Sequence, residues 1–169
     1  GPIRRLVADL RTFIPIRGGK PSDVDDWIAM LAKFDHDATG VLESTKIATG
    51  RGEGHRGQDV VEVNGSEASI VYSTQKPLQL QIGKRGDSDL HKIDVPREFL
   101  VWPGSPRDPD AGDPLATFRY DQDFEFIQAI EQKRPCRPSF AAGVAAQAVM
   151  DAALRSKETA RWIEIAEVA

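Results

Sequence analysis

The sequence predicts an α+β fold: an open, mainly antiparallel sheet with helices packed on one face. Two observations lead to this prediction. Segments with the two-residue alternation of strands fill most of residues 6–95, and two segments with helical spacing follow them. An order of strands first and helices later is typical of an antiparallel sheet with its helices gathered on one side.

The first predicted strand contains Leu6, Ala8 and Leu10, which alternate with residues that face the opposite side. Turn-forming residues at 14–21 interrupt it. A second run, residues 27–34, is too short for an independent helix and ends in the turn-prone segment 35–40. This pattern predicts a hairpin whose next strand covers residues 41–49.

A second hairpin is predicted around Asn64-Gly65, between strands at 60–63 and 68–72, because Asn-Gly readily takes the positive backbone angles of a tight turn. Residues 78–82 alternate Leu and Ile with Gln, and 91–95 continue the pattern. One face of the sheet is therefore expected to be more polar than the other.

Residues 96–114 are rich in Pro, Gly and Asp, which predicts a long surface loop. Helical spacing follows, with Phe124, Ile127 and Ile130 on one face, and Pro135 stops this segment.

Ser139 is the expected N-cap of a second helix over residues 140–155. This helix is rich in alanine, and Gly143 is expected to permit a close approach to the sheet. Residues 162–165 alternate as an edge strand does.

The bulk properties predict one soluble domain over residues 1–169. No stretch approaches the roughly 20 apolar residues of a membrane span, and no targeting signal is readable at the N-terminus, so a cytoplasmic location is expected. The net charge of -4, with acidic and basic residues interspersed, argues against nucleic acid as a partner. Cys136, the single cysteine, has no second thiol with which to pair.

The most unusual local stretch is residues 50–57, a glycine-rich segment with two arginines that could cradle a phosphate or a polyhydroxy substrate. Its glycines fall at alternate positions and a strand follows them, so it does not match the dinucleotide fingerprint. A flexible hairpin connection is favoured over phosphate binding.

Other candidate groups carry weaker signals. The three histidines are scattered without a second ligand at a metal-like spacing, so no metal site is predicted. Asp23, Asp25 and Asp26 could supply a general base, although a solvated cluster is favoured. Trp102, inside the Pro/Gly loop, is the best candidate for an exposed functional aromatic residue.

Several loose motifs, taken together and in order, cover nearly the whole chain. They are Val24-Asp25-Asp26, residues 34–44, Gly50-Arg51, residues 62–66, residues 137–143, Asp151-Ala152, Ser156 and Arg161-Trp162. In these the chain resembles the C-terminal domain of the Gfo/Idh/MocA oxidoreductases, the relatives of glucose-fructose oxidoreductase and inositol dehydrogenase.

The resemblance implies a full-length protein whose N-terminal Rossmann domain holds NAD or NADP, and whose C-terminal sheet covers the substrate and forms homo-oligomers. The cofactor glycines and the catalytic lysine of the family precede the first family-like strand, so no catalytic and no cofactor-binding residue is assigned in this chain, and no cofactor is expected in it. Arg51 and His55 resemble the part of the sheet that can face the substrate.

Two hypotheses follow. The first is a C-terminal domain of an NAD(P)-dependent sugar or polyol oxidoreductase that forms a wall of the substrate pocket and the oligomer contacts, and that is inactive alone without its Rossmann domain. The second is a non-catalytic binding or scaffold module that associates through its exposed sheet.

Overall fold

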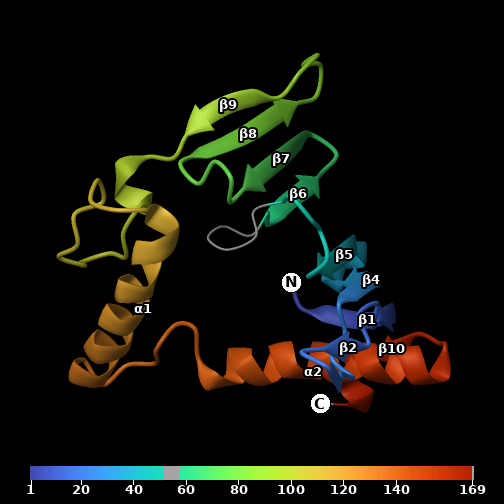
Figure 1. Ribbon diagram of the computed structural model, residues 1–169. Helices are drawn as coiled ribbons and strands as arrows, with labels where there is room; N and C mark the ends of the chain where they lie inside the picture. Colours follow the sequence, from blue (N-terminus) through green and yellow to red (C-terminus); the bar gives the residue numbers. More distant parts are fainter. Residues whose placement is uncertain (52–57, 169) are drawn as a thin grey trace. The chain divides into compact units, whose positions relative to one another are not determined.

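The computed structural model describes residues 1–51 and 58–168, and its contacts divide the chain into two compact units (Figure 1). Unit 1 comprises Gly1–Ala48 and Pro138–Ala169, and unit 2 comprises Thr49–Arg137. Each unit contains a four-stranded antiparallel sheet and a long α-helix. The predicted α+β class and open antiparallel sheet are thereby confirmed.

The sheet of unit 1 has the strand order β10-β1-β4-β5. A small hairpin, β2-β3, leaves it between β1 and β4. The elements of this unit are β1 (Ile3–Arg11), β2 (Ile16–Arg17), β3 (Lys20–Pro21), β4 (Trp27–Phe34), η1 (Asp35–Asp37), β5 (Thr39–Thr45), α2 (Phe140–Thr159), β10 (Ile163–Glu164) and η3 (Ile165–Glu167).

The sheet of unit 2 is a meander in the order β6-β7-β8-β9. The elements of this unit are β6 (Val60–Asn64), β7 (Ala68–Ser73), β8 (Gln79–Lys84), β9 (His91–Asp94), η2 (Arg97–Phe99) and α1 (Pro114–Glu131). Its register places apolar side chains on one face, namely Val61, Val63, Ile70, Tyr72, Leu80, Ile82 and Ile93. The predicted difference in polarity between the two faces is therefore confirmed.

Two strand predictions need correction in detail. The hairpin at Asn64-Gly65 forms, but neither residue has a positive φ. Its loop is longer than a two-residue turn, since Asn64 pairs with Ser69 and the Gly65 N–H donates to the Ala68 carbonyl (2.9 Å). The strand predicted to reach residue 49 ends at Thr45, whose hydroxyl accepts the N–H of Ile47 (3.2 Å).

The core of unit 1 lies between α2 and one face of its sheet. Its buried side chains are Leu6, Leu10, Ala32, Ala152, Ala153 and Ile163. Because alanines form the packed face of α2, the helix axis can lie close to β1. Burial of each large aliphatic side chain, such as Leu6 or Ile163, stabilises the fold by about 1.5–3 kcal/mol. Gly143 does not make this approach, because a methyl group at its position would meet open space.

A buried hydroxyl completes the junction between α2 and β1. Ser139 caps the start of α2 as predicted, accepting the N–H of Ala142 (3.3 Å). Near the other end, Ser156 is fully buried; its Oγ accepts the N–H of Ala8 (2.9 Å) and donates to the carbonyl of Arg161 (2.8 Å). Strand β10 pairs with β1 only at Arg5 and Leu6, so this hydroxyl takes the place of a ladder partner for Ala8.

Replacing Ser156 with alanine is expected to lower the free energy of unfolding by about 1–3 kcal/mol, because the buried N–H of Ala8 loses its acceptor. Urea denaturation followed by circular dichroism measures the change. The control is Thr159→Ala on the same helix, where an exposed hydroxyl is removed and a change within about 0.5 kcal/mol is expected. Equal effects of the two substitutions would contradict this role for Ser156.

Candidate functional site

The structure places the two predicted substrate-binding residues differently. Arg51 is exposed and follows the turn at Gly50, which has a φ of +80°. His55 lies outside the described residues. The assignment of Arg51 and His55 to a substrate surface therefore remains a prediction.

The acidic cluster at Asp23, Asp25 and Asp26 is not uniformly solvated. Asp26 is only 2% exposed, and its carboxylate accepts the N–H of Ile14 (2.7 Å) and pairs with Arg17. Asp25 pairs with Lys157 of α2 (3.1 Å). Asp26 therefore fastens the base of the β2-β3 hairpin. The expectation of a solvated cluster is wrong for this residue, because the turn-forming segment 14–21 folds back onto its carboxylate.

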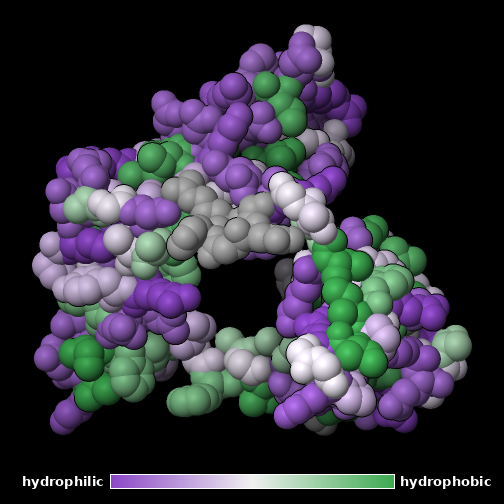
Figure 2. All heavy atoms as spheres, in the orientation of Figure 1, coloured by the Kyte–Doolittle hydropathy of each residue, from purple (hydrophilic) through white to green (hydrophobic). Residues whose placement is uncertain are grey.

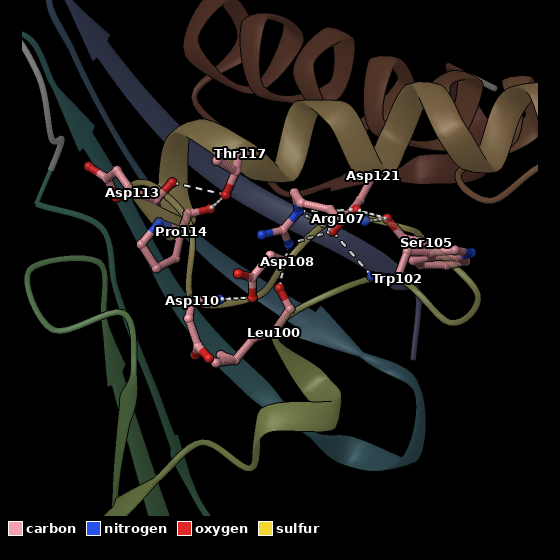
Figure 3. A network of polar contacts seen from close by, with 10 residues as sticks. All are labelled: Leu100, Trp102, Ser105, Arg107, Asp108, Asp110, Asp113, Pro114, Thr117 and Asp121. Carbon is pink, nitrogen blue, oxygen red and sulfur yellow. Dashed lines mark hydrogen bonds and ion pairs between the residues drawn. The ribbon is translucent and has the colours of Figure 1, made fainter.

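In unit 2, a polar network joins the Pro/Gly loop to helix α1 (Figure 3). Asp121 and Arg107 have side chains only 10% exposed, and Arg107 Nη2 lies 2.7 Å from Asp121 Oδ2. Asp121 also accepts the Ser105 hydroxyl (2.7 Å) and the backbone N–H of Trp102 (3.1 Å). The Arg107 guanidinium donates in addition to the Leu100 carbonyl. The middle of the loop is thus bound to one turn of α1.

One turn further along the same buried face of α1, Glu125 holds the segment that follows the helix. Its carboxylate forms a bidentate pair with Arg134 (2.6 and 2.7 Å) and accepts the N–H of Arg137 (3.3 Å). The Trp102 side chain also contributes to lowering the pKa of Glu125. Trp102, 37% exposed, is held to α1 through its backbone N–H, which donates to Asp121.

The outer rim of the loop is fastened by exposed charges. Arg97 of η2 donates through Nη2 to Asp110 Oδ2 (2.7 Å), and the two side chains are 64% and 67% exposed. At the end of the loop, Asp113 caps α1 by accepting the N–H of Leu115 (3.0 Å). The predicted loop at 96–114 is therefore tied down at its rim, its middle and its end.

These contacts set the protonation of the two helix carboxylates. The hydrogen bonds from Arg134 lower the pKa of Glu125 to about 2, against the opposing effect of burial. Hydrogen bonding to Arg107 likewise lowers the pKa of Asp121 and raises that of the arginine. Both carboxylates are ionised near neutral pH, so neither is available as a general acid. The oxygens of Asp121 accept hydrogen bonds from the loop, and those of Glu125 accept hydrogen bonds from the segment that follows α1.

The sequence contained a signal for this network that hydrophobic periodicity did not detect. The expected face of Phe124, Ile127 and Ile130 is not the buried one: Ile127 and Ile130 are 51% and 59% exposed. The buried face is formed by Asp121, Glu125 and Ala129, spaced four residues apart. Two carboxylates at that spacing, with arginines in the flanking proline-rich segments, are the pattern that could have indicated it.

The Glu125→Gln variant is expected to lose stability at neutral pH, and its deficit relative to the wild type should shrink as the pH falls. The folded-state pKa of Glu125 lies below its ordinary value of 4.5, so its stabilisation is complete above about pH 4.5 and is lost as the pH falls towards 2. Thermal unfolding followed by tryptophan fluorescence between pH 7 and pH 2 measures this. Asp123→Asn, at an exposed position of the same helix, should show no such convergence; a pH-independent deficit for Glu125→Gln would refute the assignment.

Comparison with known proteins identifies the domain type. A sequence profile described as the C-terminal alpha/beta domain of the oxidoreductase family matches residues 2–165. Levoglucosan dehydrogenase of Pseudarthrobacter phenanthrenivorans is 26% identical over 165 residues, which cover 90% of this chain and 40% of that protein.

Solved structures agree with this result. A levoglucosan dehydrogenase in complex with NADH and levoglucosan superposes with a TM-score of 0.82 at 26% identity, over 97% of this chain and 45% of that one. An oxidoreductase domain protein from Kribbella flavida superposes with a TM-score of 0.76 at 26% identity, over 96% and 44%. The chain thus spans less than half the length of these relatives, and it belongs to the Gfo/Idh/MocA oxidoreductase family as a C-terminal domain.

Proposed function

We propose that this chain is the substrate-side domain of an NAD(P)-dependent sugar or polyol oxidoreductase. The observation that carries the proposal is its likeness, over 97% of its length, to a dehydrogenase whose structure holds NADH and levoglucosan. An N-terminal Rossmann domain would hold the nicotinamide. This chain matches 45% of the relative's length, so the remaining length of the relative is sufficient for such a domain.

The division of labour follows from the chemistry. Hydride transfer requires a nicotinamide held rigidly against the carbon that carries the reacting hydroxyl, and the cofactor domain supplies that grip. This chain contributes the opposite wall, in which Arg51 and His55 donate hydrogen bonds to substrate hydroxyls. Alone it is inactive. The ionised, fully bonded carboxylates of α1 fit a supporting role, because they offer no proton to the reaction.

Self-association through the sheet is a second part of the proposal. A cytoplasmic location is a third. Exposed apolar side chains on sheet faces favour burial against another surface; in unit 2, Val61, Val63 and Ile93 are 57%, 60% and 45% exposed. The same observation favours the alternative function, a non-catalytic module that binds a partner through its sheet. Among the described residues, no helix combines the length and apolar character needed to cross a bilayer.

Turnover separates the two functions. The whole protein encoded by the natural gene is expected to reduce NAD⁺ or NADP⁺, followed at 340 nm, with levoglucosan or another sugar or polyol, whereas the 169-residue chain is expected to show no turnover. A whole protein that neither binds nicotinamide nor turns over any member of such a panel would establish the binding-module alternative. Turnover by the isolated chain would disprove the proposed division of labour.

Arg51→Ala in the whole protein is expected to raise KM for the sugar by about tenfold or more, because one charge-assisted hydrogen bond is worth about 1.5–3 kcal/mol. Steady-state kinetics at saturating cofactor measures the change. Lys76→Ala, an exposed cation in the turn between β7 and β8, is the control and should leave KM unchanged. If both variants have wild-type kinetics, Arg51 does not bind the substrate.

A further inference from the structure

The backbone of Trp102 is fixed on both sides. Its N–H donates to Asp121 Oδ2 (3.1 Å), and its carbonyl accepts the N–H of Ser105 (2.9 Å). The Ser105 hydroxyl donates to Oδ1 of the same carboxylate (2.7 Å), which closes a cycle of hydrogen bonds between the loop and α1. Gly104, with a φ of +81°, follows Pro103, as in a type II turn. Trp102 is therefore the first residue of a turn that is anchored to the helix.

The side chain of Trp102 is left partly open to solvent. The residue is 37% exposed, and in Figure 3 its ring extends away from the Arg107 guanidinium. Besides the hydrogen bonds from Arg134, the Trp102 side chain helps to lower the pKa of Glu125, so the ring lies near that carboxylate as well. The loop thus presents a large aromatic side chain on a fixed backbone.

Stability alone does not account for this arrangement. A partly exposed indole gains only part of the free energy that full burial would supply. A buried ion pair such as that of Arg107 and Asp121 is a weak source of net stability. A fixed aromatic ring favours binding instead, because its ligand does not have to order a mobile loop. The contacts of Trp102 are those of a preorganised binding surface.

The surroundings of the ring favour a hydroxylated ligand over a protein partner. Arg97 and Asp110, in the same segment, are largely exposed charged residues. Figure 2 shows hydrophilic and hydrophobic residues interspersed over the loop, on the left of the view. A protein-binding surface instead groups its apolar side chains into a continuous patch. An aromatic ring among polar groups suits a ligand that has both C–H and O–H groups on its surface.

We propose that the indole of Trp102 stacks against the ring of a cyclic sugar, and that this contact selects cyclic sugars over open-chain polyols. A sugar ring has a rigid face of C–H bonds, whose slight positive charge is attracted to the negative face of an aromatic ring. An open-chain polyol has no such face, and it loses internal rotations when it is held against a flat surface. The inference rests on the substrate-side role proposed above and assigns the residue that chooses among sugars and polyols.

Trp102 and Arg51 offer complementary contacts. Both belong to the same compact unit, Thr49–Arg137. In the proposed role, Arg51 donates hydrogen bonds to hydroxyls, which rings and open chains carry alike, whereas Trp102 contacts only the C–H face of a ring. The two contributions can therefore be separated by the choice of ligand.

Trp102→Ala in the whole protein tests the stacking. It is expected to raise the KM or inhibition constant of levoglucosan, a cyclic sugar, about tenfold, and to leave that of sorbitol, an open-chain polyol, nearly unchanged. Each compound is assayed at saturating cofactor, as a substrate or as a competitive inhibitor of whichever sugar or polyol the whole protein turns over. These constants do not depend on the folded fraction, so partial unfolding does not imitate the result. Trp102→Phe, which keeps an aromatic face, should retain most of the preference.

Trp162→Ala is the matched control. Trp162 is also 37% exposed, but it lies in unit 1, where the Arg5 guanidinium covers its ring at 5.4 Å. This variant should leave both constants unchanged. Equal loss of levoglucosan binding in the two tryptophan variants would contradict a specific role for Trp102.

The outcomes distinguish this inference from the function on which it rests. A whole protein that turns over a sugar or polyol, while Trp102→Ala keeps the wild-type preference, would overturn the stacking and leave the oxidoreductase function standing. A whole protein without turnover would overturn both.

Discussion

Unit 1 depends on the close contact between α2 and β1. Alanines on the helix make the approach possible, and the Ser156 hydroxyl supplies the hydrogen bond that the short strand β10 leaves unmade. Because side chains alternate along a strand, covering one face of the sheet fixes which residues face outward. The position of a helix on one side therefore determines the chemical pattern on the other, and with it the surface that unit 1 offers to partners.

Unit 2 is organised by a different principle. No side chain of its sheet is fully buried among the described residues, and charge instead fastens its loop to α1. A buried ion pair is a weak source of net stability, since desolvation offsets most of the attraction, but removing one partner is strongly destabilising. Such pairs specify one arrangement. Arg107 holds the loop against α1, and Arg134 holds the segment that follows the helix.

The sequence predicted those features that depend on local pattern. The strands, both hairpins, the loop and the Ser139 cap follow from alternation, turn residues and capping chemistry, which operate within a few residues. Features fixed by distant partners were not predicted. Asp26 is buried because Ile14 and Arg17 return to it, and α1 turns carboxylates inward because arginines from both flanks meet them. Arg51 and His55 were assigned from the family resemblance and not from a local pattern of strands, turns or caps.

The two kinds of ion pair on the Pro/Gly loop respond differently to dissolved salt. Arg97 and Asp110 are largely exposed, and mobile ions at physiological strength screen such charges over about 8 Å. Arg107 and Asp121 are shielded by the loop itself, so counter-ions reach them poorly. Rising ionic strength should release the rim of the loop while its centre stays attached. The loop thus combines an adjustable edge with a fixed anchor, and fluctuations of the edge need not disturb the helix beneath it.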